Sequence, residues 1–196
     1  MRSIVLASGN PGKKAEIEHL LKPFGTRVIT QVELGITEAD EPHDSFLENA
    51  LAKARHACEA TRLPALADDS GLCVDALGGA PGVQSARYAG EPKSDQRNNE
   101  KLLAEMSAHD DRLAHYVCVL VLMRGPGDAQ PLIAEAEWHG EIARAPRGSG
   151  GFGYDSCFYL KALGRTAAEL DPAEKNRISH RGQALQKLLD LLKREP

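Results

Sequence analysis

The sequence lacks an apolar run long enough to cross a membrane, and its first residues lack the length and flanks of a signal peptide. It also lacks a basic stripe interleaved with aromatic residues, and its formal net charge of -4 comes from interspersed acidic and basic side chains. The lack of a membrane-spanning run and of a signal peptide argues against a membrane partner and predicts a cytoplasmic protein. The lack of a basic stripe argues against a nucleic-acid partner, because a phosphate backbone is bound by clustered positive charge.

Cysteine is scarce, and the four residues Cys58, Cys73, Cys118 and Cys157 are widely spaced with no CxxC pair. This spacing argues against a zinc site or a disulfide framework and favours reduced thiols in apolar surroundings. Internal repeats and low-complexity tracts are also missing. The 196 residues, of which 42% are hydrophobic, predict one globular domain over residues 1–196.

Strand-like and helix-like patterns alternate along the chain. Strands are predicted at 3–7, 27–32, 116–123 and 132–138, and a further strand leads into Asp68. Helices are predicted after Lys13, at 46–61, at 94–107, from 172 onward and from 179 onward. The strands at 116–123 and 132–138 predict an antiparallel hairpin, because one short loop joins them. The alternation predicts an α/β fold, with helices flanking a mixed central β-sheet.

Two adjacent aspartates, Asp68 and Asp69, stand where the apolar stretch 63–66 ends. A buried carboxylate persists only if it is paired, hydrogen-bonded or bound to a metal. Because successive strand side chains point to opposite faces, we expect one aspartate to face a site and the other to brace the backbone. The alternative is a turn, since Asp, Ser and Gly are common turn residues.

The segment Ser8–Lys13 joins the first strand to the first helix. Gly9 and Gly12 allow a tight turn, the helix start offers unpaired N–H groups and a positive dipole end, and Lys13 adds a cation. These features predict an anion site. The segment is not a Walker A loop, because its glycines are too close and Lys14 stands where Ser or Thr is required. A plain glycine turn with a surface lysine is the alternative.

The acidic residues Asp40 and Glu41 lie just before the helix that carries Lys53. Carboxylate oxygens are ligands of hard cations, so this loop is a candidate to join Asp69 around Mg²⁺. A solvated run of charge is the alternative.

Two further segments carry binding chemistry. Phe152–Asp155 combines aromatic faces, a glycine and a carboxylate, which suits stacking and edge-bonding of a planar base, although the aromatic rings could also be core residues. His180 and Arg181 stand at a helix start, where the dipole disfavours positive charge. A binding role therefore explains these two residues better than stability does.

Five strings resemble the inosine/xanthosine triphosphate pyrophosphatase (Ham1-like) family, and they span the whole chain in the same order. They are SGNPGK at 8–13, FLENA at 46–50 with Lys53 following, ADDSGL at 67–72, GGFGYD at 150–155, and Glu174–Lys175 followed by ISHRG at 178–182. The departures are mild. Ser8 replaces the usual Thr and keeps the hydroxyl, and Ser156 stands where Pro is frequent.

The resemblance implies an enzyme that acts on acid anhydrides. It implies Mg²⁺-dependent hydrolysis of non-canonical purine nucleoside triphosphates (ITP, dITP and XTP) to the monophosphate and pyrophosphate, which cleanses the nucleotide pool. It also implies two lobes around a substrate cleft and a homodimer, with the segment 78–88 as a candidate contact.

The resemblance also assigns roles. The catalytic residues would be Asp69, which activates the water that attacks the α-phosphorus, together with Asp68 and Lys53. Asp69 and the loop residues Asp40 and Glu41 would hold the metal. Phe152 would stack on the base, and His180 and Arg181 would sense the purine. The other expected substrate-binding residues are Ser8, Gly9, Asn10, Pro11, Gly12, Lys13, Ser70, Gly153, Tyr154, Asp155 and Lys175.

Two alternative functions remain open at this stage. A nucleotide-sensing module without turnover would keep the lysines and the stacking residues but would not need the acidic cluster. A septum-inhibitor (Maf-like) pyrophosphatase for modified or pyrimidine nucleotides would share the general chemistry. The Ser179–Arg181 motif favours the purine enzyme.

Overall fold

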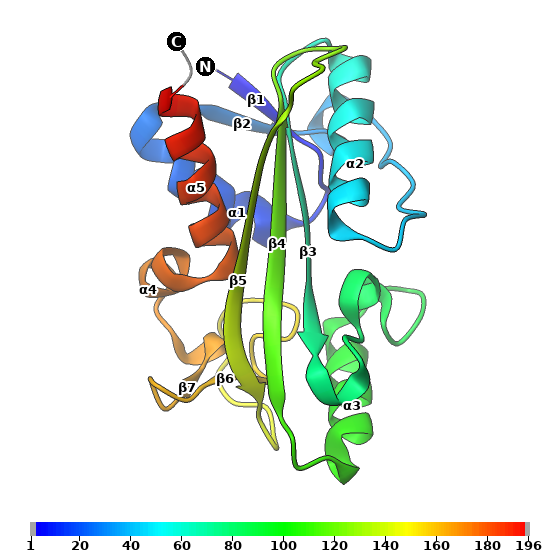
Figure 1. Ribbon diagram of the computed structural model, residues 1–196, viewed down its shortest axis with the longest axis vertical. Helices are drawn as coiled ribbons and strands as arrows, with labels where there is room; N and C mark the ends of the chain where they lie inside the picture. The colour runs from blue at the N-terminus through cyan, green and yellow to red at the C-terminus, as the bar shows by residue number, and fades with distance from the viewer. Residues whose placement is uncertain (1–2, 195–196) are drawn as a thin grey trace. The chain divides into compact units, whose positions relative to one another are not determined.

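The computed structural model describes residues 3–194, which contain five α-helices and one seven-stranded sheet (Figure 1). The order of strands is β2-β1-β3-β4-β5-β6-β7. Their bounds are β1 Ser3–Leu6, β2 Arg27–Thr30, β3 Ala65–Val74, β4 Leu113–Met123, β5 Leu132–Ile142, β6 Phe158–Leu160 and β7 Arg165–Thr166.

The sheet is mixed, as the sequence predicts. Strand β1 pairs in parallel with β2 and β3, whereas β6 pairs antiparallel with β5 and β7. The neighbours β4 and β5 are joined by only eight residues, which requires an antiparallel hairpin. Along β5, exposed Ile133, Glu135 and Glu137 alternate with buried Ala134 and Ala136, so one face of this strand is open.

The chain divides into two compact units. Among the described residues, the first unit comprises 3–69, 118–136 and 181–194, and the second comprises 70–117 and 137–180. Strands β3, β4 and β5 contribute residues to both. The single domain and the substrate cleft that the sequence led us to expect stay predictions.

In the first unit, helices α1 (Pro11–Leu21) and α5 (His180–Arg194) share one apolar core with the strands. Ile17, Leu185 and Leu188 are buried in it. Helix α2 (Phe46–Thr61) lies on the opposite side of the strands (Figure 1). Ser45 caps α2 by accepting the N–H of Glu48. The polar side of α2, which carries Asn49 and Lys53, is buried.

The second unit has a separate core, built from residues such as Leu72, Tyr116, Trp138 and Phe158. It also contains α3 (Asp95–Glu105) and α4 (Pro172–Ile178), which begin after the caps Ser94 and Asp171. The glycine-rich segment 145–154 contains neither helix nor strand. The sequence did not indicate β6 and β7, which have three and two residues.

Several predicted boundaries differ from the structure: β4 begins at Leu113, β5 ends at Ile142, and α1 begins at Pro11. The largest difference lies at the two aspartates of β3. The sequence places Asp68 and Asp69 at the end of a strand, but β3 runs without a break from Ala65 to Val74. Both aspartates are buried within it. Nearby cations neutralise their charge, so the segment Asp68–Gly71 stays extended instead of turning out toward water.

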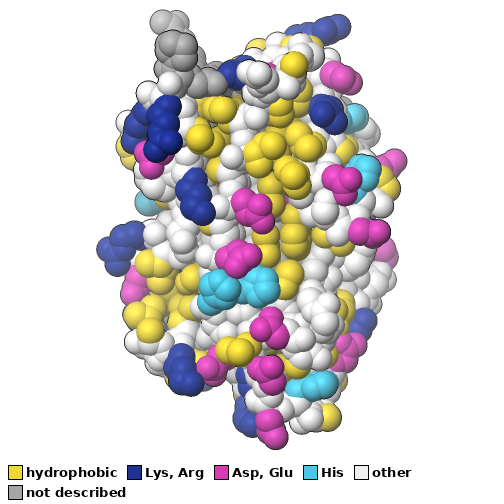
Figure 2. Space-filling model, in the orientation of Figure 1, with side chains coloured by type: hydrophobic (Ala, Val, Ile, Leu, Met, Phe, Trp, Pro, Cys, Tyr) yellow, Lys and Arg dark blue, Asp and Glu magenta, His cyan; other side chains and the backbone are white. Residues whose placement is uncertain are grey.

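None of the helices within residues 3–194 combines the length and the hydropathy of a membrane-spanning helix. On the face shown in Figure 2, Lys and Arg side chains are scattered among acidic ones and form no continuous stripe. The expected lack of a nucleic-acid partner stays a prediction.

Candidate active site

A buried ion-pair network surrounds Asp68 in the first unit. Arg181 donates from Nε to Asp68 Oδ2 at 2.6 Å, and the ammonium of Lys13 lies 2.7 Å from Oδ1. Arg181 also donates from Nη1 to Glu16, and the thiol of Cys118 lies 3.6 Å from Asp68 Oδ2. Arg181 is only 2% exposed and Asp68 is fully buried.

The opposite charges in this network stabilise each other's ionised form. Burial on its own would raise the pKa of Asp68, but Arg181 and Lys13 hold that pKa well below its usual range. Burial likewise lowers the pKa of Arg181, while Asp68 and Glu16 raise it well above its usual value. Both groups are therefore ionised, and removal of either would leave a buried charge without its main partner.

Asp69, the next residue along β3, belongs to a second set of contacts. Lys53 Nζ lies 2.6 Å from Asp69 Oδ1 and 2.8 Å from Glu41 Oε1. Burial raises the pKa of Asp69, and the positive charges of Lys53 and Lys13 offset only part of that rise. Burial lowers the pKa of Lys53, but Asp69 and Glu41 raise it overall.

The backbone of Asp68 connects the two sets. Its carbonyl oxygen accepts hydrogen bonds from Lys13 Nζ at 3.1 Å and from Lys53 Nζ at 3.0 Å. The two ammonium groups are thus gathered at one point of β3. A polyphosphate requires positive charge concentrated in this way.

The carboxylates of Asp69 and Glu41 both reach the same ammonium group, whereas Asp40 is exposed and makes no hydrogen bond or ion pair with the described residues. Within residues 3–194, no group of three or more His, Cys, Asp or Glu side chains is arranged to hold a metal. Two carboxylates nevertheless fit Mg²⁺, which commonly takes one or two protein carboxylates and fills its other positions with water and substrate phosphates.

The loop Ser8–Lys13 corrects one expectation. Asn10 Oδ1 accepts the N–H groups of Gly12 and Lys13 at 2.8 and 3.1 Å, so the start of α1 is capped and does not offer these donors unpaired. Asparagine is a preferred N-cap residue for this reason. Pro11 occupies the first helical position, and the Gly9 N–H donates to Glu38 Oε1 at 2.9 Å.

In the second unit, Asp155 organises the predicted base-binding segment. Its Oδ2 accepts from Lys175 Nζ at 2.5 Å and from the Phe152 N–H at 2.9 Å. The Lys175 ammonium lies 5.0 Å from the ring centroid of Phe152. A Cβ at Gly151 would lie 2.0 Å from Asp155 Oδ2, and Gly151 has φ +72°, so glycine is required there.

Helix α3 holds the same segment through its backbone. The Gly153 N–H donates to Asp95 Oδ2 at 2.6 Å, and the Gly153 carbonyl accepts from Asn99 Nδ2 at 2.8 Å. The Tyr154 hydroxyl donates to the Ser85 carbonyl at 2.7 Å, and Tyr154 is 3% exposed. The position of Tyr154 therefore agrees with the core alternative, whereas Phe152 is only half-buried.

His180 is buried in the second unit. Its ring stacks on Tyr116 with centroids 4.5 Å apart and planes inclined by 5°. Ser70 follows Asp69 on β3 and is partly buried.

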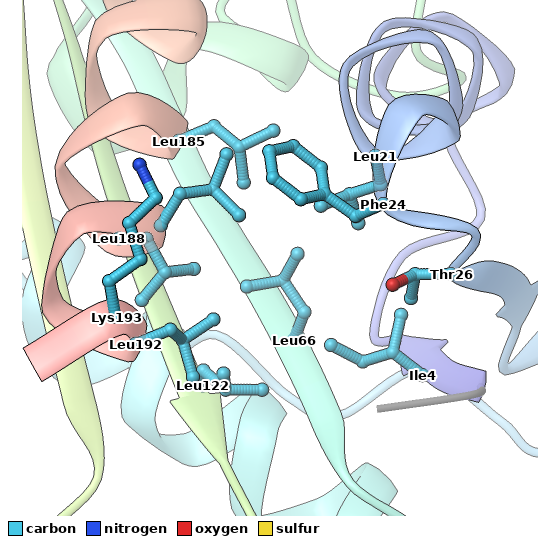
Figure 3. A pocket seen from close by; sticks show the side chains of 11 residues that line it. Ile4, Leu21, Phe24, Thr26, Leu66, Leu122, Leu185, Leu188, Leu192 and Lys193 are labelled. Carbon is cyan, nitrogen blue, oxygen red and sulfur yellow. The ribbon is translucent and has the colours of Figure 1, made fainter. Parts of the chain in front are cut away.

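Two cavities contain none of the predicted site residues. The one in the first unit has a volume of about 390 Å³, and apolar side chains line it apart from Thr26 and Lys193 (Figure 3). The one in the second unit, near Trp138 and Leu163, has a volume of about 420 Å³. The first offers a triphosphate only one cation, so the charged groups along β3 are the better candidate site.

Residues 4–191 match the sequence model of the Ham1 family. The chain belongs to the Ham1 family. It is 63% identical over 196 residues to the dITP/XTP pyrophosphatase of Ralstonia nicotianae, with 98% of each chain covered. It is 62% identical to the enzyme of the same name from Nitrosomonas europaea, with 98% of this chain and 95% of the relative covered.

Solved structures of Ham1 proteins share the fold. A HAM1 protein from Coxiella burnetii is 51% identical with a TM-score of 0.90, and all of both chains is covered. The Staphylococcus aureus Ham1 protein is 40% identical with a TM-score of 0.85, covering 97% of this chain and 98% of the other. The predicted α/β fold and the family resemblance are both confirmed.

Two groups of residues in this Ham1-family chain were missed from the sequence. Glu16 lies one turn beyond Lys13 on α1 and pairs with Arg181. Asp95 and Asn99 hold the segment Phe152–Asp155 through its backbone, which leaves no motif in the sequence. The one sequence signal that could have placed Glu16 in the site is its spacing from Lys13, because residues three apart share a helix face.

Proposed function

We propose that the chain is a Mg²⁺-dependent nucleoside triphosphate pyrophosphohydrolase that converts ITP, dITP and XTP to the monophosphate and pyrophosphate. The observation that carries this proposal is its identity of 63% and 62%, over nearly the whole chain, to proteins named dITP/XTP pyrophosphatase. The charged residues along β3 support it, because a nucleotide-sensing module would not need the acidic cluster.

The chemistry of the triphosphate falls to the first unit in this proposal. Lys13 and Lys53 neutralise the phosphates and the departing pyrophosphate. Asp69 accepts the proton of the water that attacks the α-phosphorus. The bond between the α-phosphorus and the oxygen that joins it to the β-phosphorus breaks, and pyrophosphate leaves. A general base must be held in position, and the contact with Lys53 at 2.6 Å holds the Asp69 carboxylate.

Asp69 and Glu41 would hold Mg²⁺, which when bound supplies positive charge to the phosphate oxygens. Glu41 is the better candidate than Asp40, because Glu41 and Asp69 share a contact with Lys53. The lysine and the metal would then compete for the same carboxylates.

We propose that Asp68 and Arg181 position the reacting groups. Asp68 holds Lys13 through its carboxylate, and its carbonyl oxygen holds both Lys13 and Lys53. Arg181 is engaged by Asp68 and Glu16, so its influence on catalysis passes through Asp68. The expected sensing of the purine is then assigned to His180.

The second unit provides the residues for the base. Phe152 offers a ring face for stacking. Asp155 accepts the backbone N–H of Phe152 and also holds Lys175, whose ammonium lies beside the Phe152 ring. Ser70 and Gly153 keep the substrate-binding role that the family resemblance implies, and the loop Ser8–Gly12 keeps it for the phosphates. Tyr154 supports the base-binding segment from the core.

The proposal includes one catalytic domain over residues 1–196 and a homodimer in the cytoplasm, where nucleoside triphosphates are made and used. The match to the Ham1 family over residues 4–191 supports the single domain. Light scattering after size-exclusion chromatography tests the dimer. A mass of one chain at micromolar concentration would contradict it.

A panel of nucleotides tests the proposed activity. ITP, dITP, XTP, ATP, GTP, CTP and UTP are each incubated with the enzyme and Mg²⁺, and pyrophosphate is resolved from orthophosphate. We expect pyrophosphate and the monophosphate, with ITP and XTP preferred over ATP by about tenfold or more. Removal of the metal with EDTA should abolish turnover, and Mg²⁺ should restore it. Preference for pyrimidines would favour the Maf-like alternative, and no turnover would favour a binding module.

A further inference from the structure

One N–H group of the loop Ser8–Lys13 is bound by a carboxylate from outside the loop. Glu38 lies in the irregular connection before α2, and its Oε1 accepts the Gly9 N–H at 2.9 Å. A Cβ added to Gly9 would lie 2.7 Å from that oxygen. The carboxylate of Glu38 is therefore seated directly against the backbone of Gly9, and both residues are exposed.

The other N–H groups of the loop are satisfied locally. Ser8 donates to the Leu6 carbonyl at 2.8 Å, and Asn10 donates to Ser8 Oγ at 3.1 Å. Gly12 and Lys13 donate to Asn10 Oδ1, and Pro11 has no N–H to offer. The Gly9 N–H thus differs from the others, because its acceptor is an anionic oxygen that is exposed to solvent.

A phosphate oxygen can replace a carboxylate oxygen on such a donor, since both are anionic acceptors of similar geometry. The neighbouring residue anchors the connection independently, because Thr37 O lies 2.9 Å from His56 Nε2 of α2. Loss of the Glu38 carboxylate would therefore leave the backbone of the connection tethered.

We propose that Glu38 occupies the place of a substrate phosphate oxygen on the Gly9 N–H and so sets the affinity for the polyphosphate. Glu38 acts in two ways: it competes for the donor, and its negative charge repels the incoming phosphates. This inference rests on one part of the proposed function, namely that the loop Ser8–Lys13 binds phosphate. Because Glu38 is exposed, screening by water and salt keeps the expected effect modest.

Calorimetric titration with inorganic tripolyphosphate tests the proposal without a nucleoside. For Glu38→Ala we expect the Kd of tripolyphosphate to fall by about three- to tenfold relative to the parent. Glu38→Gln should give a smaller decrease, because the amide oxygen still accepts the N–H although the charge is gone. With ITP, the KM should fall in the same order while kcat stays unchanged.

Asp44→Asn is the matched control. Asp44 is an exposed acidic residue of the same connection and makes no hydrogen bond or ion pair with the described residues. This variant should change the Kd by less than about twofold, since it removes a charge that screening weakens. An equal change in Asp44→Asn and Glu38→Ala would contradict the proposal.

Two further outcomes would also overturn it. Weaker binding in the Glu38 variants would mean that Glu38 holds the loop in its binding form. An absence of tripolyphosphate binding in every variant, the parent included, would mean that the loop is no anion site. The proposed function fails separately, because it is tested by the nucleotide panel and not by tripolyphosphate affinity.

Discussion

The candidate site residues of the first unit and those of the second differ in how much charge they carry. Among the described residues, the ion pairs around Asp68 and Asp69 connect three cations with four carboxylates, so this set carries a formal charge of -1. The cations are Lys13, Lys53 and Arg181, and the carboxylates are Glu16, Glu41, Asp68 and Asp69. The second unit pairs one cation with one carboxylate beside Phe152. In the proposed function, the first set exchanges partners with the charged triphosphate and its metal, and the neutral second set binds the uncharged base.

The two regions also differ in their backbone support. Asp68 and Asp69 lie within the ten-residue strand β3, whose neighbours in the sheet are β1 and β4. Phe152–Asp155 lies on turns that depend on Gly151 and on contacts from α3. We therefore expect substitutions in the first unit to affect the rate, and substitutions in the second to affect binding of the nucleoside.

The largest effect is expected for Asp69→Asn. The amide keeps the shape of the side chain but loses the charge that holds Mg²⁺ and the proton acceptor. We expect kcat for ITP to drop by about 10²-fold or more, with little change in the thermal midpoint. Asp44→Asn is the control for the same chemical change. A parent-like rate with unchanged Mg²⁺ dependence would show that Asp69 has only a structural role.

A smaller but still large effect is expected for Arg181→Lys. Lysine cannot reproduce the fork of donors to Asp68 and Glu16, and disruption of a buried ion pair costs up to about 3–5 kcal/mol of stability. We expect kcat/KM to fall by about tenfold for ITP and by the same factor for residual ATP turnover. Arg177→Lys, at an exposed arginine of α4, is the control. A loss confined to ITP would instead assign Arg181 to base sensing.

Gly151→Ala is expected to weaken nucleotide binding without slowing the chemistry. Its Cβ would displace the Asp155 carboxylate, and with it the contacts to Phe152 and Lys175. We expect KM for ITP to rise by about tenfold, equivalent to about 1.4 kcal/mol. Gly153→Ala bears the same positive-φ strain, but nothing lies within 4 Å of its Cβ. Equal effects of the two variants would show that backbone strain alone is responsible.

Sequence reasoning performed well where structure is local. The starts of α2 and α4 follow from Ser45 and Asp171, and these helices begin as predicted. Helix α1 begins at Pro11 instead of after Lys13, because Asn10 caps it. Sequence reasoning failed at Asp68–Gly71, where turn propensity yields to ion pairs with residues distant in the chain, above all Arg181. Local patterns carry no information about such partners.

The same reason explains the incomplete prediction of the candidate site. The motifs identify Lys13, Lys53 and Lys175 as residues that carry chemistry, but not the carboxylate that each one contacts. Nor does the loop Ser8–Lys13 reveal that Glu38 binds Gly9, 29 residues away. Family resemblance provides the activity, and the structure adds which charges neutralise one another.

The central claim is that the first unit handles the phosphates and the second handles the nucleoside. The most direct test compares the affinities of Lys53→Met and Phe152→Leu for inorganic tripolyphosphate, which has no base, and for ITP. We predict that Lys53→Met weakens binding of both ligands by a similar factor. Phe152→Leu should weaken binding of ITP by about tenfold, as expected for loss of base stacking, and leave tripolyphosphate affinity unchanged. Equal losses for both ligands in Phe152→Leu would contradict the account.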